Sequence, residues 1–405
     1  MDINTIRKID YYAGIIICFI LTVFNKAAKI FGIAKKPKKY PKNMLFIELS
    51  EMGSTVLAYP AMKKIKDLYP DSKLYFLIFK KNKPSVEILK IIEKENIITI
   101  RDNSFFALIL DTIKAILKLR KRKIDTSFDL ELFSRFSNIL SYLSGANNRI
   151  GFNNYYAEGL YRGDLQTHKI YYNTHQHISM NFLSMIYSLE TNIRDRPLLK
   201  KEIDKKDIQL PQLPLTKEKQ TNIWNILKSI NPAISRKNKL VIINPNAGDI
   251  LPIRAWPIQN YIELIKKLLE DKKTFIIITG TKCAKSDAEL ITREVANNRC
   301  INLVEKTKFG ELIDLFNISN LLITNDSGPG HFASLTPIKT IVFFGPETPN
   351  LYKPIGKNVT VFYKQLACSP CLTAFNHRHS PCKNNKCLKA IKVDEVYQTA
   401  KKLIK

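Results

Sequence analysis

The stretch Leu321–Pro349 constrains the fold more than any other part of this sequence. Two apolar runs of strand type, 321–324 and 340–344, flank a glycine-rich turn and a short helical segment expected over 331–335. Strands that alternate with helices in this way form parallel sheets covered by helices on both faces. The stretch therefore predicts a doubly wound α/β domain.

The turn between these two runs carries residues that suit a phosphate. Asp326 and Ser327 are residue types that begin helices, and Gly328 and Gly330 keep the backbone open. Backbone N–H groups and the positive end of the helix dipole then point at one spot. His331 is expected to donate a hydrogen bond to ligand oxygens, whereas Asp326 would repel a phosphate and is expected to meet a sugar hydroxyl or the loop's own N–H groups. A well-capped but ordinary βαβ unit, with His331 as a structural contact, is the alternative.

Length and charge restrict the class of protein. With 405 residues the chain is long for one core, so two domains are expected. Lys and Arg total 64 and Asp and Glu total 36, and the net charge of +28 predicts an anionic partner. The sequence has no zinc-finger spacing, RNA-recognition signature or compact Arg-rich arm, which disfavours nucleic acid. An acidic membrane surface or a phosphorylated substrate fits better.

An uncharged apolar segment, 11–24, lies near the N-terminus. At about 1.5 Å per residue it reaches roughly 21 Å, which is short of the ~30 Å hydrocarbon core of a bilayer. We expect residues 1–42 to form a membrane-associated, monotopic helix and a basic linker. The lysines of that linker favour the cytoplasmic side; they are Lys35, Lys36, Lys38, Lys39 and Lys42. A buried core helix is the alternative interpretation.

Strands and helices alternate in two halves of the chain. Strands of the first half are expected at Met44–Leu49, Leu74–Phe79, Ile97–Ile100, Ser127–Leu132 and Arg149–Phe152. Strands of the second half are expected at Leu240–Asn244 and Phe275–Thr279, in addition to the two described above. Two prolines within 208–215 mark a linker between the halves.

Two motifs resemble the signature of glycosyltransferase family 9, the bacterial lipopolysaccharide heptosyltransferases. They are D-S-G-P-G-H-x-A-x(3)-P, starting at Asp326, and F-G-P-x-x-P, starting at Phe344. The resemblance implies a GT-B fold, with two Rossmann-like, doubly wound domains facing a central cleft. An acceptor domain is expected over 43–210, a nucleotide-sugar donor domain over 211–388, and a C-terminal helix over 389–405 that packs back toward the first domain.

The same resemblance implies an activity. A heptose would pass from ADP-heptose to a lipid-linked anionic glycan, the lipopolysaccharide inner core, at the cytoplasmic face of the inner membrane. Motifs that bind the phosphates of the donor do not determine which sugar is bound, so another nucleotide sugar or acceptor glycan is an alternative. A relative that binds nucleotide sugars without catalysis is a further one.

The second half carries the residues expected to bind the donor. The block N-P-N-A-G…R-A-W-P resembles the family's H/N-P-G-A…K/R-x-W-P motif, which implies that Arg254 contacts the donor diphosphate and stabilises the leaving group. Thr279 and Gly280 form another strand-end turn, and Asp287 just beyond it is expected to meet the ribose. The expected set is Asn246, Arg254, Thr279, Gly280, Asp287, Asp326, Ser327, Gly328, Gly330 and His331.

The first half departs from the family at one important position. The segment S-E-M-G-S-T-V-L-A-Y-P resembles the family's S-x-x-G-D-x(5)-P turn, in which the Asp is the general base. Ser54 occupies that position here, and an unassisted hydroxyl is a poor base. Glu51 lies in the same loop and is the expected substitute, while Glu48 lies within the strand and is less suited. The alternative is that Glu51 merely caps the following helix.

Four cysteines near the C-terminus have spacing that suits a metal. They are Cys368, Cys371, Cys382 and Cys387, with His377 and His379 between the two pairs. A CxxC pair followed by a second pair predicts a structural zinc site, and ordinary thiols are the alternative. No Asp-x-Asp motif accompanies the phosphate loop, so transfer without a metal cofactor is expected.

Overall fold

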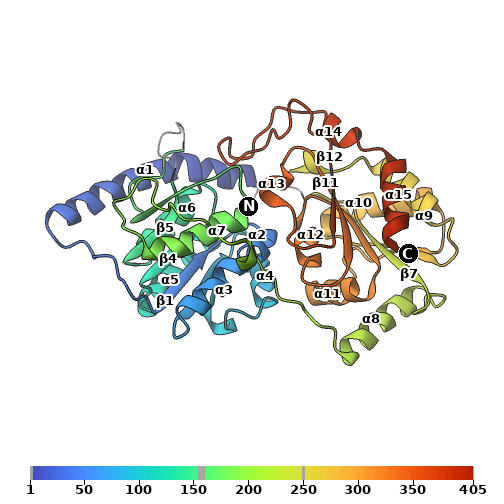
Figure 1. Cartoon of the computed structure of the whole chain (residues 1–405), viewed down its shortest axis with the longest axis horizontal. Helices are drawn as coiled ribbons and strands as arrows, with labels where there is room; N and C mark the ends of the chain where they lie inside the picture. Colours follow the sequence, from blue (N-terminus) through green and yellow to red (C-terminus); the bar gives the residue numbers. More distant parts are fainter. Residues whose placement is uncertain (1–2, 154–159, 249–250, 405) are drawn as a thin grey trace. The chain divides into compact units, whose positions relative to one another are not determined.

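The computed structural model describes residues 3–153, 160–248 and 251–404. The chain divides into two compact units, Met1–Gln209 and Leu210–Lys405 (Figure 1). The division falls inside the predicted linker 208–215, whose two prolines interrupt regular structure. Each unit is an α/β domain with its own parallel sheet, as the sequence predicts.

The first unit is built on a six-stranded parallel sheet of order β3-β2-β1-β4-β5-β6. Its strands are β1 (Asn43–Ile47), β2 (Lys73–Phe79), β3 (Ile97–Ile100), β4 (Thr126–Asp129), β5 (Asn148–Asn153) and β6 (His168–Tyr171). In the register of the two central strands, Ile47 pairs with Asp129. The chain runs outward from β1 to β3 and then returns to β4, so the strand order reverses between β1 and β4. Ligands of open α/β sheets bind at such a switch point.

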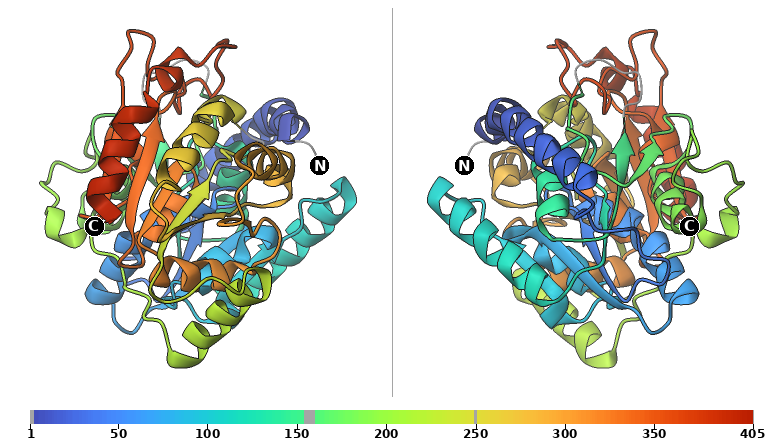
Figure 2. Two further views of the ribbon diagram at one scale, coloured as in Figure 1. Left: turned by 90° about the vertical axis from the view of Figure 1, so that its right-hand side faces the viewer. Right: turned by 90° about the vertical axis from the view of Figure 1, so that its left-hand side faces the viewer.

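Helices cover both faces of this sheet. They are α2 (Met52–Leu57), α3 (Tyr59–Leu68), α4 (Lys83–Glu87), α5 (Phe105–Lys121), α6 (Arg135–Leu143) and α7 (Ile178–Tyr187), with 3-10 turns at 80–82, 94–96, 188–190 and 205–207. Leu45, Leu77 and Ile98 share one core cluster with residues of α5 and α6. Helices α3 and α7 pack together on the opposite side (Figure 2). Helices α2 and α3 are separate elements, and Pro60 lies in the first turn of α3.

A 28-residue helix, α1 (Ile3–Ile30), precedes the first strand. Its buried Cys18 forms a cluster with Ile139 and Leu165, and it packs along α6. Its segment Thr5–Ile30 is long and apolar enough to cross a membrane by length and composition, and 17% of its apolar window is buried. Interpretation as a fully buried core helix is therefore wrong, because most of its apolar side chains face outward.

The second unit repeats the same plan, with strand order β12-β11-β10-β7-β8-β9. Its strands are β7 (Lys239–Asn244), β8 (Thr274–Ile278), β9 (Cys300–Asn302), β10 (Leu321–Asn325), β11 (Lys339–Phe344) and β12 (Val359–Tyr363). Its helices are α8 (Lys217–Ile230), α9 (Ile258–Leu268), α10 (Lys285–Val295), α11 (Phe309–Ile318), α12 (Gly328–Ala333), α13 (Pro349–Tyr352), α14 (Lys386–Lys389) and α15 (Val393–Ile404), with 3-10 turns at 252–254 and 282–284. The switch point of this sheet lies between β7 and β10.

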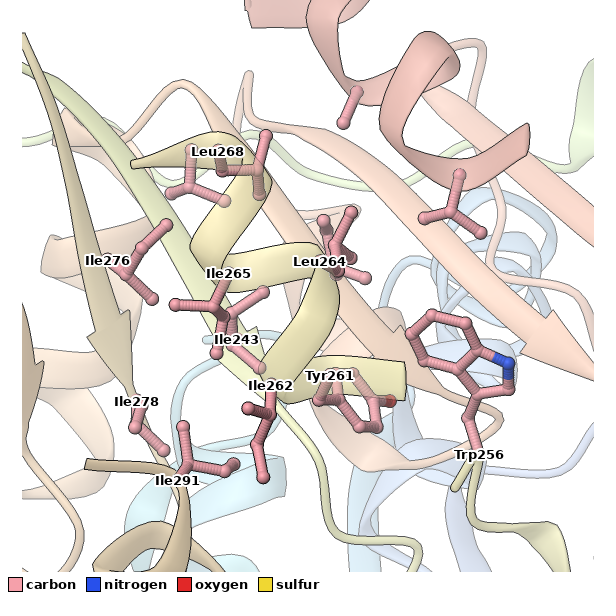
Figure 3. Packing of buried hydrophobic residues seen from close by; sticks show 14 of the residues in the cluster. Ile243, Trp256, Tyr261, Ile262, Leu264, Ile265, Leu268, Ile276, Ile278 and Ile291 are labelled. Atoms are coloured by element: carbon pink, nitrogen blue, oxygen red, sulfur yellow. The ribbon is translucent and has the colours of Figure 1, made fainter. Parts of the chain in front are cut away.

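The core of the second unit joins α9, α15 and the sheet. Figure 3 shows Ile262 and Ile265 of α9 pointing toward Ile276 and Ile278 of β8. The indole of Trp256 packs against Phe343 of β11 at a ring-centroid distance of 4.6 Å. Helix α15 buries its apolar side within this core and packs on α9. The expectation that it also reaches the first unit stays a prediction.

Candidate active site

The loops that leave β7 and β10 are held together by one buried side chain, Asn325. Its Oδ1 atom accepts hydrogen bonds from the backbone N–H of Trp256 at 2.9 Å and from the Tyr261 hydroxyl at 3.1 Å. Its Nδ2 atom donates to the carbonyl of Pro245 at 2.6 Å. Asn325 is fully buried, so these bonds have no water to compete with them. The two loops are thereby fixed beside each other at the switch point.

This arrangement brings Arg254 next to Asp326, as expected for residues of one site. A guanidinium Nη1 of Arg254 lies 3.3 Å from Oδ2 of Asp326, and Nη2 donates to the carbonyl of Ala247 at 3.3 Å. The side chain of Arg254 is 17% exposed and that of Asp326 only 6%. Burial raises the pKa of Asp326 above its ordinary value, although the charge of Arg254 opposes this shift. The guanidinium therefore neutralises one buried carboxyl and remains accessible to a second anion.

A third charged residue of this region, Glu347, was not predicted from the sequence. It follows β11 and is 2% exposed, and its Oε1 atom lies 3.3 Å from Nε of Arg378. Burial raises the pKa of Glu347 well above its ordinary value; the nearby Asp326 carboxylate adds to the rise and Arg254 opposes it. Two ion pairs, Arg254–Asp326 and Arg378–Glu347, thus lie near each other, and each contains a buried carboxyl.

The glycine-rich turn itself leaves the start of α12 accessible. Ser327 is the N-cap residue of α12, but its hydroxyl donates to the carbonyl of Asn325 at 3.2 Å and makes no side-chain cap. Ser327 therefore stands at the start of the helix, as its residue type predicts, but its side chain bonds back to the strand end. A Cβ on Gly330 would lie 3.3 Å from Pro354, so a larger residue there would require a small shift of that proline, whereas a Cβ on Gly328 would meet no close neighbour. His331 lies within α12 and is 7% exposed.

Other residues expected at the donor site have structural partners. Oδ1 of Asn246 accepts a hydrogen bond from the backbone N–H of Gly248, which closes their own turn. The Thr279 hydroxyl accepts from Asn244 at 3.2 Å at the end of β8. A Cβ on Gly280 would lie 2.5 Å from that of Ala284, so this glycine permits close packing. Asn246 and Thr279 therefore shape the strand ends and have side chains already engaged.

Asp287 lies on a different element from the loops after β7 and β10 that carry Arg254 and Asp326. It stands in the first turn of α10, and burial raises its pKa. Helix α10 follows β8, and in the sheet β8 and β10 lie on opposite sides of β7. A role for Asp287 at the ribose stays a prediction.

In the first unit, Glu51 and Ser54 are in direct contact. Ser54 donates a hydrogen bond from its hydroxyl to Oε2 of Glu51 at 3.0 Å. Glu51 is the N-cap residue of α2 but makes no side-chain cap, so the interpretation as a mere capping residue is wrong. Glu48 is 3% exposed, and its Oε1 atom accepts from the N–H of Glu51 at 3.4 Å. Of the two carboxylates, Glu51 is the more accessible.

A further acid, Glu131, was missed in the sequence. It follows β4, directly across the switch point from the loop after β1. Its Oε1 atom accepts hydrogen bonds from the N–H of Leu49 at 2.8 Å and from the N–H and hydroxyl of Ser50 at 3.1 and 3.0 Å. Burial raises the pKa of Glu131, and the hydrogen bond from Leu49 opposes the rise. Glu131 therefore fixes the loop that carries Glu51.

The four C-terminal cysteines are not gathered into a metal site. Within residues 3–153, 160–248 and 251–404 no group of three His, Cys, Asp or Glu side chains is placed to hold a metal ion. Cys368 and Cys382 are exposed, whereas Cys387 is buried against Gly345. The Cys371 sulfur accepts a hydrogen bond from the Ser380 hydroxyl at 3.2 Å. Burial raises the pKa of the Cys387 thiol, and the nearby Cys371 and Cys368 add to the rise.

Comparison with known proteins gives a consistent result. The family model described as "Glycosyltransferase family 9 (heptosyltransferase)" matches residues 115–380 of this chain. A lipooligosaccharide heptosyltransferase 2 of Campylobacter jejuni is 27% identical over 372 residues, which cover 89% of this chain and 98% of the relative.

Solved structures share the fold. The ADP-heptose lipopolysaccharide heptosyltransferase II of E. coli has a TM-score of 0.68 at 18% identity, covering 89% of this chain and 98% of that one. Another E. coli heptosyltransferase, solved with ADP-2-deoxy-2-fluoro heptose, has a TM-score of 0.59 at 14% identity and covers 89% and 99%. The two-unit GT-B architecture is thus confirmed for this chain.

Proposed function

The chain belongs to glycosyltransferase family 9, and we propose that it transfers a heptose from ADP-heptose to the inner core of lipopolysaccharide. It is a glycosyltransferase by membership of that family. The nature of the sugar and of the acceptor rests on its relatives, which are named as heptosyltransferases of lipooligosaccharide or lipopolysaccharide. The acceptor in this proposal is a lipid-linked anionic glycan, which the net charge of +28 favours.

The second unit would bind the donor. The diphosphate lies at the 326–331 turn, where backbone N–H groups at the start of α12 and the guanidinium of Arg254 meet it. Asp326 accepts a hydrogen bond from Arg254 at 3.3 Å, so its carboxyl orients the guanidinium and also accepts from a sugar hydroxyl. Charge that develops on the departing diphosphate is stabilised by groups already in place.

The first unit would activate the acceptor. An acceptor hydroxyl attacks the anomeric carbon of the donor and forms the new glycosidic C–O bond. The bond from that carbon to the diphosphate oxygen breaks, and its electron pair leaves with ADP. Glu51 takes the hydroxyl proton, and Ser54 holds the Glu51 carboxylate through their 3.0 Å hydrogen bond. The reaction balances without a further reactant.

We propose that the transfer step needs no metal ion, because no Asp-x-Asp motif accompanies the phosphate loop. The zinc hypothesis for Cys368, Cys371, Cys382 and Cys387 concerns stability and not catalysis.

We also propose that the enzyme works at the cytoplasmic face of the bacterial inner membrane as a peripheral or monotopic protein. Exposed apolar side chains along α1 and the lysines that follow it support this location. At this surface the enzyme would reach a lipid-linked acceptor whose lipid remains in the bilayer.

One observation carries the donor assignment: Arg254 and Asp326 pair at the switch point beside the glycine-rich turn. A thermal-shift panel of nucleotide sugars tests it with the purified full chain. We expect ADP-heptose to raise the unfolding temperature selectively, because a ligand that binds only the folded state stabilises it. Glucose linked to UDP and mannose linked to GDP serve as controls. A selective rise with one of these instead would contradict the proposed donor.

A further inference from the structure

Helix α1 is fixed lengthwise to the first unit by one stripe of side chains. Asp10 accepts a hydrogen bond from the N–H of Phe136 at 2.8 Å, and it pairs with the buried Arg135. One turn further along, a Cβ on Gly14 would lie 2.8 Å from Arg135, so this glycine permits close contact. Near the other end, Asn25 donates to the carbonyl of Asp164 at 2.8 Å. A helix that crossed a bilayer would have to release all of these contacts, so α1 is held along the surface of the unit.

The outer side of α1 is apolar. Its exposed side chains recur at helical spacing; they include Tyr12, Ile16, Phe19, Val23 and Phe24. Tyr12 is 68% exposed and Phe24 is 63% exposed. An apolar stripe along most of a helix that is otherwise docked on its unit needs a partner of low polarity.

Helix α5 likewise has one buried side and one exposed apolar side. Ala115 and Leu119 are buried against the sheet. On the outer side, Phe106, Leu110, Ile113 and Leu117 follow one another at spacings of four, three and four residues. All four are exposed, Phe106 by 79% and Leu117 by 63%. These spacings place them on one side of the helix.

Both helices belong to the same layer of the first unit. Helix α6 lies beside each of them: it packs along α1, and the Arg120 guanidinium of α5 donates to its Leu143 carbonyl at 2.8 Å. In both views of Figure 2, α1 and α5 lie on the same side of this unit, opposite α3. We call the exposed apolar side chains of α1 and α5 named above the α1–α5 face.

Basic residues border this face. Lys114, Lys118 and Lys121 lie on α5 beside its apolar stripe, and Arg122 and Lys123 follow it directly. The single acidic residue of α5, Asp111, is paired with Arg101 at 2.7 Å. Apolar side chains bordered by cationic ones match the acyl boundary and the anionic headgroups of a membrane, respectively.

We propose that the α1–α5 face docks on an anionic phospholipid bilayer, with α1 lying flat on the surface and α5 as a second lipid-contacting helix. This deepens the membrane location within the proposed function, because it replaces a single N-terminal anchor with a two-helix platform. It also fixes which layer of the acceptor unit faces the lipid. The partner is a lipid surface and not a second copy of this chain, because the basic border would repel another copy of this basic protein.

Vesicle co-sedimentation of the full chain tests this proposal without donor or acceptor. The vesicles contain phosphatidylethanolamine and phosphatidylglycerol. The α5 variant is Phe106→Gln, Leu110→Gln, Ile113→Gln and Leu117→Gln, which keeps a good helix former at each exposed position. The control is Ile230→Gln with Phe375→Gln, which removes exposed apolar side chains from the second unit.

We expect the α5 variant to bind vesicles at least about tenfold more weakly than wild type, while the control binds equally well. Added salt should weaken wild-type binding, because the basic border attracts anionic headgroups. The unfolding temperature and the donor-induced thermal shift should stay at wild-type values in both variants, so a failed donor assignment remains distinguishable.

Two results would overturn the proposal. Vesicle binding by the α5 variant equal to that of wild type would leave α1 as the sole anchor. A wild-type dimer in sedimentation velocity that the α5 variant abolishes, together with no vesicle binding by wild type, would assign the face to self-association.

Discussion

The Ser54 hydroxyl donates a hydrogen bond of 3.0 Å to the Glu51 carboxylate. The position that carries the general base in the family therefore supports a carboxylate three residues earlier in the same loop. The Glu131 carboxylate fixes that loop by accepting from the N–H groups of Leu49 and Ser50. Ser54 thus holds the carboxylate of Glu51, and Glu131 holds the backbone of the same loop.

Replacement of the proposed base gives the first prediction. Glu51→Gln keeps the shape of the side chain and removes its basicity, so transfer should fall by about 10²–10⁴-fold. The affinity for ADP, measured by calorimetry, should not change. Ser54→Ala should cost much less, because it removes only one hydrogen bond that orients the carboxylate. Near-normal turnover by Glu51→Gln would move the role to Glu48, Glu131 or the substrate.

The second prediction concerns the donor diphosphate. Arg254→Ala removes a charged hydrogen-bond donor at the switch point, so ADP binding should weaken by about 1.5–3 kcal/mol. Arg293→Ala is the matched control, because Arg293 is 73% exposed on α10 of the same unit. His331→Ala and Asp326→Ala should lose transfer while the protein remains folded. Equal ADP affinity in wild type and all three variants would remove the assignment of this site.

A pH effect is expected at Glu347, whose pKa burial raises well above the ordinary value of 4.5. Above pH 4.5 the unfolded chain releases this proton and the folded chain retains it. Rising pH therefore favours unfolding until the pH passes the raised pKa. Glu347→Gln cannot release a proton, so its stability should exceed that of wild type by a margin that widens with pH. Urea unfolding at about pH 4 and about pH 8 measures the difference in the free energy of unfolding between Glu347→Gln and wild type. An equal difference at the two pH values would show that Glu347 is ionised in the folded protein.

The cysteines give a simple test. If Cys368, Cys371, Cys382 and Cys387 bind zinc, protein purified without chelator should contain about one equivalent of metal with four sulfur ligands. Cys382→Ser should then lower both the metal content and the unfolding temperature, whereas Cys283→Ser on the 3-10 turn before α10 should change neither. Metal-free wild type would leave the four as ordinary thiols.

Much of the fold was predictable because buried parallel strands have continuous apolar sequences. The strands from β1 to β5, together with β7, β8, β10 and β11, lie where the sequence predicted them, within a few residues. The three strands that were missed, β6, β9 and β12, are all edge strands of their sheets. They are short or only half-buried, so their composition carries a weaker signal.

The residues of the candidate site that belong to a family motif were predictable from the sequence. The residues that the folding of the sheet brings to the site were less predictable. Arg254 and Asp326 lie together as the family motifs imply. Glu131 lies at a strand end of the first sheet, and Asn325 and Glu347 lie at strand ends of the second. Only the order of the strands shows which loops each of them meets. The available signal was a polar residue at the end of each apolar run. The position of Ser327 at the start of α12 agrees with its residue type, but the partner of its hydroxyl could not be predicted, because a serine side chain can bond to several nearby backbone groups.

The most direct test of the proposed function is mass spectrometry of an acceptor after incubation with the full chain. The acceptor is a heptose-deficient lipopolysaccharide core, and ADP-heptose is offered beside other nucleotide sugars. We predict that the acceptor gains one heptosyl group with ADP-heptose, that ADP is released in equal amount, and that Glu51→Gln loses most of this product. A mass gain with a different nucleotide sugar, or none with any donor, would contradict heptosyl transfer as the function of this chain.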